Sequence, residues 1–199
     1  MSYSIPTATT TDLHFHLKCR HCGAQTPFQA AYVCEECYGP LEVSYDYAFL
    51  RDTLSQEHVG KGPRTLWRYR PLLPLPAKAA VPPLAVGGTP LYNAPRLAAD
   101  LGLAQVWVKD DGRNPTGSLK DRASAVVVAR AMAQGIEVVT TASTGNAAAA
   151  LAGLSASVGL PAVIFVPASA PEAKIAQLLT YGAHVLLVQG NYALSPIHI

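Results

Sequence analysis

The segment IEVVTTASTGNAAAALAGLSASVGLPAVIFVP, residues 136–167, has two short apolar stretches on either side of a longer alanine-rich one. Residues 136–142 and 161–167 are typical of strands, and residues 145–159 are typical of a helix that ends near Gly159. Because a strand, a crossover helix and a second strand normally form a right-handed parallel unit, the segment predicts an α/β fold.

The same alternation continues on both sides of this segment. Residues 104–110 alternate like a strand, and residues 118–135 predict a helix. Residues 169–182 predict another helix, and residues 184–189 a fourth strand. We therefore predict an open parallel βαβαβαβ unit over residues 96–199, with helices on both faces of the sheet.

Polar residues and glycines mark the ends of two of these helices. Gly135 and Gly182 follow the last turns, where a left-handed residue commonly ends a helix. In the later helix we expect Ser169 as the N-cap, with Pro171 in the first turn and Glu172 completing a capping box.

The composition favours a buried sheet over a disordered or highly charged protein. Half of the 199 residues are hydrophobic and 14% are charged, which suits a sheet with both faces covered. The formal net charge is +2, and no Lys/Arg run has the density that binds nucleic acid or an anionic membrane. The sequence shows neither a secretion signal nor an apolar stretch long enough to span a bilayer. We expect a cytoplasmic protein without a nucleic-acid or membrane partner.

The 4 cysteines form two C-x-x-C pairs near the N-terminus: Cys19, Cys22, Cys34 and Cys37. This spacing matches a tetrahedral zinc site, and a ribbon this small has little core without a metal or a disulfide. Without a secretion signal, zinc is favoured over disulfides. His21 is an alternative ligand. We predict a four-cysteine, zinc-ribbon-like module over residues 1–50, and we take it as structural because few basic or aromatic residues flank the cysteines.

A proline-rich stretch separates this module from the α/β unit. Seven prolines lie between residues 71 and 95: Pro71, Pro74, Pro76, Pro82, Pro83, Pro90 and Pro95. Because proline lacks a backbone N–H and fixes φ, this density forbids a regular helix or a central strand. We predict an extended connector over residues 51–95.

Ligands of parallel α/β sheets bind beyond the carboxyl ends of the strands, which selects two loops here. The first leads from residue 110 to Lys120, and the second is residues 143–146. Neither contains the glycine pattern of a dinucleotide site or a P-loop. Both carry hydroxyl and amide side chains that, with backbone N–H groups at a helix start, suit a carboxylate or a phosphate: Asn114, Thr116, Ser118, Ser143, Thr144 and Asn146. An alternative is that residues 143–146 only cap a helix.

Lys120 lies where an amine is unexpected. Ser118 and Asp121 fit a capping pattern that places Ser118 at the N-cap and Lys120 in the first turn. The partly positive helix end opposes an ammonium group and Arg122 adds a like charge, whereas Asp121 acts in the opposite direction. A neutral amine would be a nucleophile that can form a Schiff base with an aldehyde cofactor, and a solvated lysine that merely begins a helix is the alternative.

Three segments resemble the threonine synthases, a family of fold type II pyridoxal phosphate (PLP) enzymes: GGTPLYNAPRLAADLG at 87–102, NPTGSLKDRAS at 114–124 and STGNAAAALA at 143–152. The resemblance extends from about Cys19 to Tyr192. It implies that Lys120 binds PLP as a Schiff base and transfers protons, and that Asn146 hydrogen-bonds the cofactor's 3-hydroxyl. It also implies that the substrate carboxylate binds the second loop: Ser143, Thr144, Gly145, Asn146 and Ala147.

The reaction implied by this resemblance converts O-phospho-L-homoserine and water to L-threonine and phosphate, so the partner would be a small amino-acid phosphate. A threonine dehydratase or cysteine synthase-like activity is the alternative within the superfamily, and a non-catalytic zinc-ribbon and α/β fragment is the alternative outside it. Family members continue for a further domain. We therefore expect this chain to be C-terminally truncated, with weak or no catalysis by itself. The sequence leaves open whether it forms a homo-oligomer.

Overall fold

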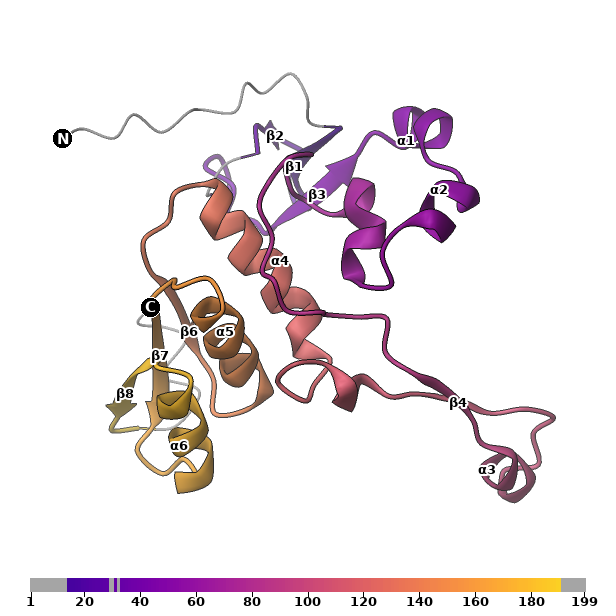
Figure 1. The fold of residues 1–199 in the computed structure, drawn as a ribbon. Coiled ribbons are helices and arrows are strands. Elements are labelled where there is room, and N and C mark those ends of the chain that lie inside the picture. Colours follow the sequence, from indigo (N-terminus) through magenta and orange to yellow (C-terminus); the bar gives the residue numbers. More distant parts are fainter. Residues whose placement is uncertain (1–13, 29–30, 32, 191–199) are drawn as a thin grey trace.

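The computed structural model describes residues 14–28, 31 and 33–190, and Figure 1 shows their arrangement. The N-terminal part is a three-stranded antiparallel sheet in the order β2-β1-β3. Its strands are β1 (Phe15–Cys19), β2 (Gln25–Thr26) and β3 (Leu41–Tyr45). The alternate residues Phe15, Leu17 and Cys19 of β1 are buried, which gives this small sheet one apolar face.

Helices occupy the chain after this sheet, at the end of the predicted module and in the first half of the predicted connector. They are α1 (Tyr47–Thr53), α2 (Gln56–Lys61) and the 3-10 helix η2 (Leu66–Leu72). The Asp46 and Ser55 side chains cap α1 and α2 by accepting hydrogen bonds from the Phe49 and His58 backbone N–H groups. Residues 73–90 form no helix or strand, in agreement with their proline content. The extended connector is therefore limited to the second half of the predicted range.

The strand predicted at residues 104–110 exists, but its predicted place in the parallel sheet is wrong. It is β5 (Trp107–Lys109), and it pairs antiparallel with β4 (Leu91–Asn93) in a separate two-stranded sheet. The helix α3 (Pro95–Asp100) lies in the connection between the two strands. Both strands are exposed on both faces. Strands buried between helix layers are apolar throughout, so the alternation of residues 104–110 fits an exposed pair better than a sheet interior.

The parallel sheet has three strands in the order β6-β7-β8. They are β6 (Val139–Ala142), β7 (Ala162–Pro167) and β8 (His184–Val188), with Val139 opposite Ala162 and Val163 opposite His184. The helices α4 (Lys120–Ala133), α5 (Asn146–Ala156) and α6 (Glu172–Thr180) alternate with these strands. The α/β class and its parallel strands are confirmed.

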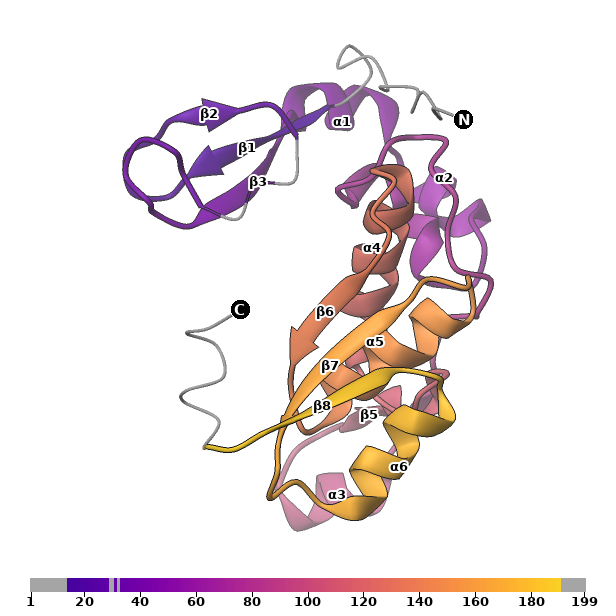
Figure 2. The same cartoon turned by 90° about the vertical axis from the view of Figure 1, so that its left-hand side faces the viewer.

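In the part of the chain that the structure describes, α4, α5 and α6 all lie on one face of this sheet, so the predicted cover on both faces is wrong (Figure 2). One apolar core joins Val128 of α4, Leu154 of α5 and Leu178 of α6 to Ile164 of β7. The reason is topological. When successive strands are added in one direction, right-handed crossovers place every helix on the same face, and only a reversal of strand order moves a helix to the other.

Glycines end all three helices of this unit as predicted. Gly135, Gly159 and Gly182 have φ values of 66°, 70° and 77°, in the left-handed region that favours glycine. The predicted start of α6 is wrong, because the N-cap position is Pro171 and no side chain caps the helix. Pro171 has an extended ψ of 131°, so the helix begins only at Glu172 and Ser169 lies in the turn before it.

Within the described ranges, no helix combines the length and the hydrophobicity that crossing a membrane requires. Residues 1–13 and 191–199 lie outside these ranges. The prediction of an early chain end depends on the second of these segments, so the structure does not address it.

Candidate functional site

Lys120 is the first residue of α4, and its side chain is exposed. The buried Ser118 hydroxyl accepts a hydrogen bond from the Lys120 backbone N–H at 3.2 Å, and the Ser118 carbonyl accepts one from the Asp121 N–H at 3.4 Å. The predicted N-cap at Ser118 is wrong, because the N-cap position is Leu119 and no side chain caps the helix, although the Ser118 hydroxyl still satisfies the Lys120 backbone donor. This arrangement presents the lysine amine to solvent at the helix N-terminus.

Asp121 does not complete the predicted capping box. Its carboxylate is fully buried and accepts hydrogen bonds from the Thr116 backbone N–H, at 2.8 Å, and from the Thr116 hydroxyl. A buried carboxylate must be hydrogen-bonded, and the loop before the helix supplies both donors here. Asp121 thus connects the start of α4 to Thr116, whose hydroxyl is occupied by this contact.

Arg122 is paired with a carboxylate, which offsets the like charge that we expected it to place near Lys120. Its Nε and Nη2 atoms donate to the two oxygens of Asp111 at 3.0 and 2.8 Å. The Arg122 guanidinium and the Thr89 hydroxyl, which donates at 2.7 Å, hold the pKa of Asp111 at about 2. The hydrogen bonds to Asp111 in turn raise the pKa of Arg122. The local charge beside Lys120 is therefore nearly balanced.

Hydrogen bonds join residues 86–90 to residues 110–119, the loop before Lys120 (the Lys120 loop). This connection was not predicted from the sequence. The buried Asn114 side chain accepts from the Gly87 N–H at 2.9 Å and donates to the Asp111 carbonyl at 3.0 Å. The Lys109 amine donates to the Thr89 carbonyl. Asn114 was expected to face a ligand, but it has a structural contact instead. The adjacent carboxylates of Asp110 and Asp111 were the signal in the sequence that this loop would bind a cationic side chain such as Arg122.

The second loop, residues 143–145, lies between β6 and α5. The Ser143 hydroxyl accepts a hydrogen bond from the Gly145 N–H at 3.2 Å, and Gly145 is the N-cap position. No side chain caps α5, so the alternative in which this loop only caps a helix loses its support. Asn146 is exposed as the first residue of α5, and Ala147 is half-buried beside it. Backbone N–H groups in the first turn of a helix are donors for an anion.

Both loops lie at the same end of the α/β unit. Figure 1 shows α4 and α5 beginning at the end of the unit where β6 finishes, and the two helices pack against each other. Gly153 of α5 is in contact with the Lys120 loop, because a Cβ atom added there would lie 2.7 Å from Cγ2 of Thr116. Two neighbouring helices thus begin at the predicted site residues: α4 at Lys120, and α5 within residues 143–147.

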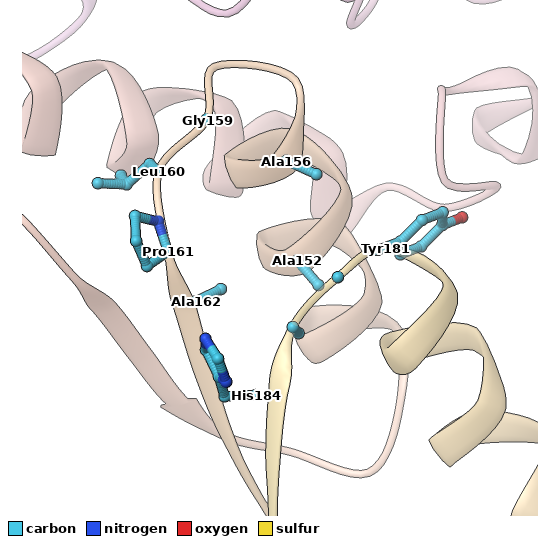
Figure 3. Close-up of a pocket in the computed structure, with 10 residues that line it drawn as sticks. Ala152, Ala156, Gly159, Leu160, Pro161, Ala162, Tyr181 and His184 are labelled. Atoms are coloured by element: carbon cyan, nitrogen blue, oxygen red, sulfur yellow. The ribbon is translucent and has the colours of Figure 1, made fainter.

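A cavity of about 350 Å³ lies elsewhere in the molecule (Figure 3). Ala162 and His184, the first residues of β7 and β8, line it together with Ala152, Ala156 and Tyr181. It is therefore at the amino ends of the strands, opposite to the Lys120 end. Since ligands of parallel sheets bind at the carboxyl ends, we do not take this cavity as the candidate site.

The four cysteines lie together between β1 and β3. The sulfur atoms of all four, Cys19, Cys22, Cys34 and Cys37, are within 4.8 Å of one another. The Sγ separations of Cys19 from Cys37 and of Cys22 from Cys34 are 3.5 and 3.6 Å. Hydrogen bonds from the backbone N–H groups of Cys22 and His21 lower the pKa of the Cys19 thiol to about 6. A Cβ atom at Gly39 would lie 3.0 Å from the Cys19 sulfur, so this glycine leaves room for the cluster.

Residues 83–195 match the family model described as pyridoxal-phosphate dependent enzyme. The chain is 41% identical over 180 residues to the threonine synthase of Methanosarcina acetivorans, covering 89% of this chain and 44% of that protein. It is 41% identical over 177 residues to the threonine synthase of Methanocaldococcus jannaschii, again covering 44% of that protein. The chain therefore spans less than half the length of these two relatives.

Solved structures agree on the fold. A fungal L-serine ammonia-lyase from Rhizomucor miehei superimposes with a TM-score of 0.50 and 27% identity, covering 55% of this chain and 35% of that chain. The diaminopropionate ammonia lyase of Escherichia coli has a TM-score of 0.52 at 21% identity, covering 55% of this chain and 33% of that chain, and supports the fold alone.

Proposed function

This chain belongs to the pyridoxal-phosphate dependent enzyme family, and on that premise we propose that it carries the lysine half of a threonine synthase active site. The reaction would convert O-phospho-L-homoserine and water to L-threonine and phosphate. The observation that carries the proposal is the 41% identity to two threonine synthases over nearly the whole chain, which includes both loops of the candidate site.

Lys120 is the residue proposed to bind PLP and to transfer protons. The exposed amine at the start of α4 can reach an aldehyde in solution. The neighbouring ionisable groups are occupied, since Asp121 is bound to Thr116 and Arg122 to Asp111. Neither group therefore binds the Lys120 amine, which is proposed to act as the nucleophile and afterwards as the base. PLP, when bound, would supply the electron sink for the reaction.

The loop before α5 is proposed to hold the remaining groups. Asn146, exposed at the helix start, would hydrogen-bond the 3-hydroxyl of PLP. The uncapped start of α5 supports a site for the substrate carboxylate, because its backbone N–H groups and the helix dipole favour an anion. The proposed carboxylate ligands are Ser143, Thr144, Gly145, Asn146 and Ala147.

A pair of assays tests the proposed reaction against its closest alternative. We expect phosphate release from O-phospho-L-homoserine, weak at most with this chain and PLP alone, and no 2-ketoacid from L-threonine. Ketoacid formation without phosphate release would favour a dehydratase. Because the chain covers 44% of its relatives, the same assays on a longer polypeptide that adds the remaining length of a relative provide the positive reference.

We further propose that the four cysteines hold one Zn²⁺ ion. Four thiolates around zinc at about 2.3 Å have sulfur–sulfur separations of about 3.8 Å, and the separations of 3.5 and 3.6 Å in this cluster are close to that geometry. His21 is exposed beside the cluster, and its backbone N–H contacts the Cys19 sulfur, as expected for support rather than ligation. The residues 1–50 would then form a zinc-ribbon-like module with a structural role.

The proposed partner is a small amino-acid phosphate. A cytoplasmic location and the absence of nucleic-acid and membrane partners stay predictions from the composition.

A further inference from the structure

Gly153 lies in the middle of α5, where glycine is costly for a helix. Glycine loses more conformational freedom than alanine on folding and weakens a helix interior. The residues around it in α5 are mostly alanine, so a small apolar side chain fits the rest of this helix. Gly153 is also buried. Its backbone conformation does not require glycine, so the reason must be space.

Thr116 occupies the space beside Gly153. A Cβ atom on residue 153 would lie 2.7 Å from Cγ2 of Thr116, a distance that real Cβ contacts do not reach. The threonine cannot turn away freely, because its hydroxyl and its backbone N–H both donate to the carboxylate of Asp121. Asp121 is itself fully buried and follows Lys120 directly in the chain. The contact therefore links a fixed side chain of the Lys120 loop to a fixed position on α5.

We propose that Asp121 and Thr116 are positioning residues that seat the Lys120 loop against Gly153 and so set the place of the Lys120 amine relative to the loop at residues 143–146. Gly153 is seven residues, or about 10 Å along the helix axis, from the start of α5 at Asn146. Because a helix is rigid over this length, a displacement at the contact between Thr116 and Gly153 would also move the start of α5. The effect of this positioning on the reaction of Lys120 with PLP rests on the proposed function, whereas the positioning itself does not.

The test uses a pair of substitutions that compensate each other. Gly153→Ala adds the methyl group that collides with Thr116, and Thr116→Ser removes Cγ2 while it keeps the hydroxyl that binds Asp121. The full chain is mixed with PLP and borohydride, and the rate of pyridoxyl attachment to Lys120 is followed by peptide mass spectrometry. We expect Gly153→Ala to slow attachment by up to about a hundredfold, since a misplacement of about 1 Å can cost this much. The double variant should return to the wild-type rate within about twofold.

Gly60→Ala is the matched control. Gly60 is also a helical glycine, in α2, but an added Cβ atom there meets nothing within 4 Å. This variant should label Lys120 at the wild-type rate. Asp121→Asn should slow labelling as Gly153→Ala does, without rescue by Thr116→Ser, because the amide nitrogen replaces one of the two oxygens that accept hydrogen bonds from Thr116.

Amide hydrogen exchange without PLP separates this proposal from the proposed function. We expect Gly153→Ala to speed exchange in residues 115–121 and 143–149, and the double variant to restore protection. If wild-type Lys120 takes up no pyridoxyl group, the proposed function fails, and the exchange data alone decide the positioning role. A double variant that stays as perturbed as Gly153→Ala, in exchange or in labelling, overturns the positioning role.

Discussion

Asp111 is the carboxylate that neutralises the arginine beside Lys120, and its pairing should make stability depend on pH. The Arg122 contact holds the pKa of Asp111 at about 2, below its ordinary value of 3.8. A carboxylate with a lowered pKa stabilises the folded state above its ordinary pKa, and the stabilisation is lost as the pH falls through the lowered pKa. We expect Asp111→Asn to reduce the free energy of unfolding near neutral pH, with a difference from the wild type that shrinks between about pH 4 and about pH 2.

Urea unfolding followed by circular dichroism measures this difference across the pH range. Asp100→Asn is the control, because Asp100 is exposed at the end of α3 and its replacement should change stability by less than about 0.5 kcal/mol. A constant effect of Asp111→Asn at every pH would contradict the pairing.

At the scale of single residues, the sequence predicted where a residue lies in its helix better than which side chain it binds. Lys120 lies in the first turn of a helix, as the local pattern indicated, although the N-cap position is Leu119 and not Ser118. The partners of Asp121 and Arg122 could not be predicted in the same way. Asp121 is buried and accepts hydrogen bonds from Thr116 in the loop before the helix. Arg122 binds Asp111, which lies eleven residues earlier in the chain, because the loop between them folds back. Both contacts depend on tertiary packing, which a capping pattern does not describe.

The helix α5 is the element that joins the candidate site to the core. Its residues from Ala148 to Ser155 are buried, and Leu154, near the end of this run, is 0% exposed. Small side chains allow α4 and α5 to approach closely, so the few large residues at the interface carry much of the packing. The stability of the site end should therefore depend on these residues.

We expect Leu154→Ala to lower the free energy of unfolding by about 2–5 kcal/mol, because it removes buried methyl groups and leaves a cavity. Leu179→Ala on α6 is the matched control, since Leu179 is 57% exposed and its replacement should cost less than about 0.5 kcal/mol. Chemical unfolding of the two variants compares them. Equal effects would show that the α5 interface is not the core of this unit.

Hydrophobic pattern predicted the type and order of these elements, but not every partner. The helices and strands from residue 120 to residue 188 follow the predicted order, and their glycine ends agree. The error in β5 arose because alternation indicates a strand without identifying its neighbour, which is β4. The error in α6 arose because a proline with an extended ψ can stand at the N-cap position in place of a serine.

The two parts of the molecule are joined by specific contacts of the N-terminal sheet. His14 Nε2 lies 2.8 Å from the Pro71 carbonyl oxygen, and the Tyr45 hydroxyl donates to the Leu72 carbonyl at 2.9 Å. The Arg130 guanidinium of α4 lies 4.0 Å from the ring centre of Phe28. These contacts join the N-terminal sheet to η2 and to α4. A metal at the cysteine cluster would stabilise this sheet.

We expect the purified chain to bind one zinc ion, and a chelator to unfold the ribbon while α4 and α5 keep their structure, because a ribbon of this size gains most of its stability from the metal. Metal analysis and amide exchange over residues 14–28 and 33–45 measure both effects. Cys22→Ser should lose the metal, and His21→Ala should keep it. Loss of zinc in His21→Ala, with retention in a cysteine variant, would show that the four-thiolate set is wrong.

At the scale of the whole chain, the sequence predicted the α/β class and two cysteine pairs that the fold brings together. The one-sided sheet could not be read from the pattern, because strand periodicity is the same whichever face a helix covers. The relations between modules also escaped prediction. They depend on single contacts such as that of Tyr45 with Leu72, which have no periodic signal.

The most direct measurement is the site of covalent attachment when the chain is mixed with PLP and reduced with borohydride. We predict that peptide mass spectrometry finds the pyridoxyl group on Lys120 well above the level on Lys61 and Lys174, and that Lys120→Ala abolishes this preference. Labelling spread evenly over the lysines, or a Lys120 that stays unmodified, would contradict the assignment of Lys120 as the cofactor lysine.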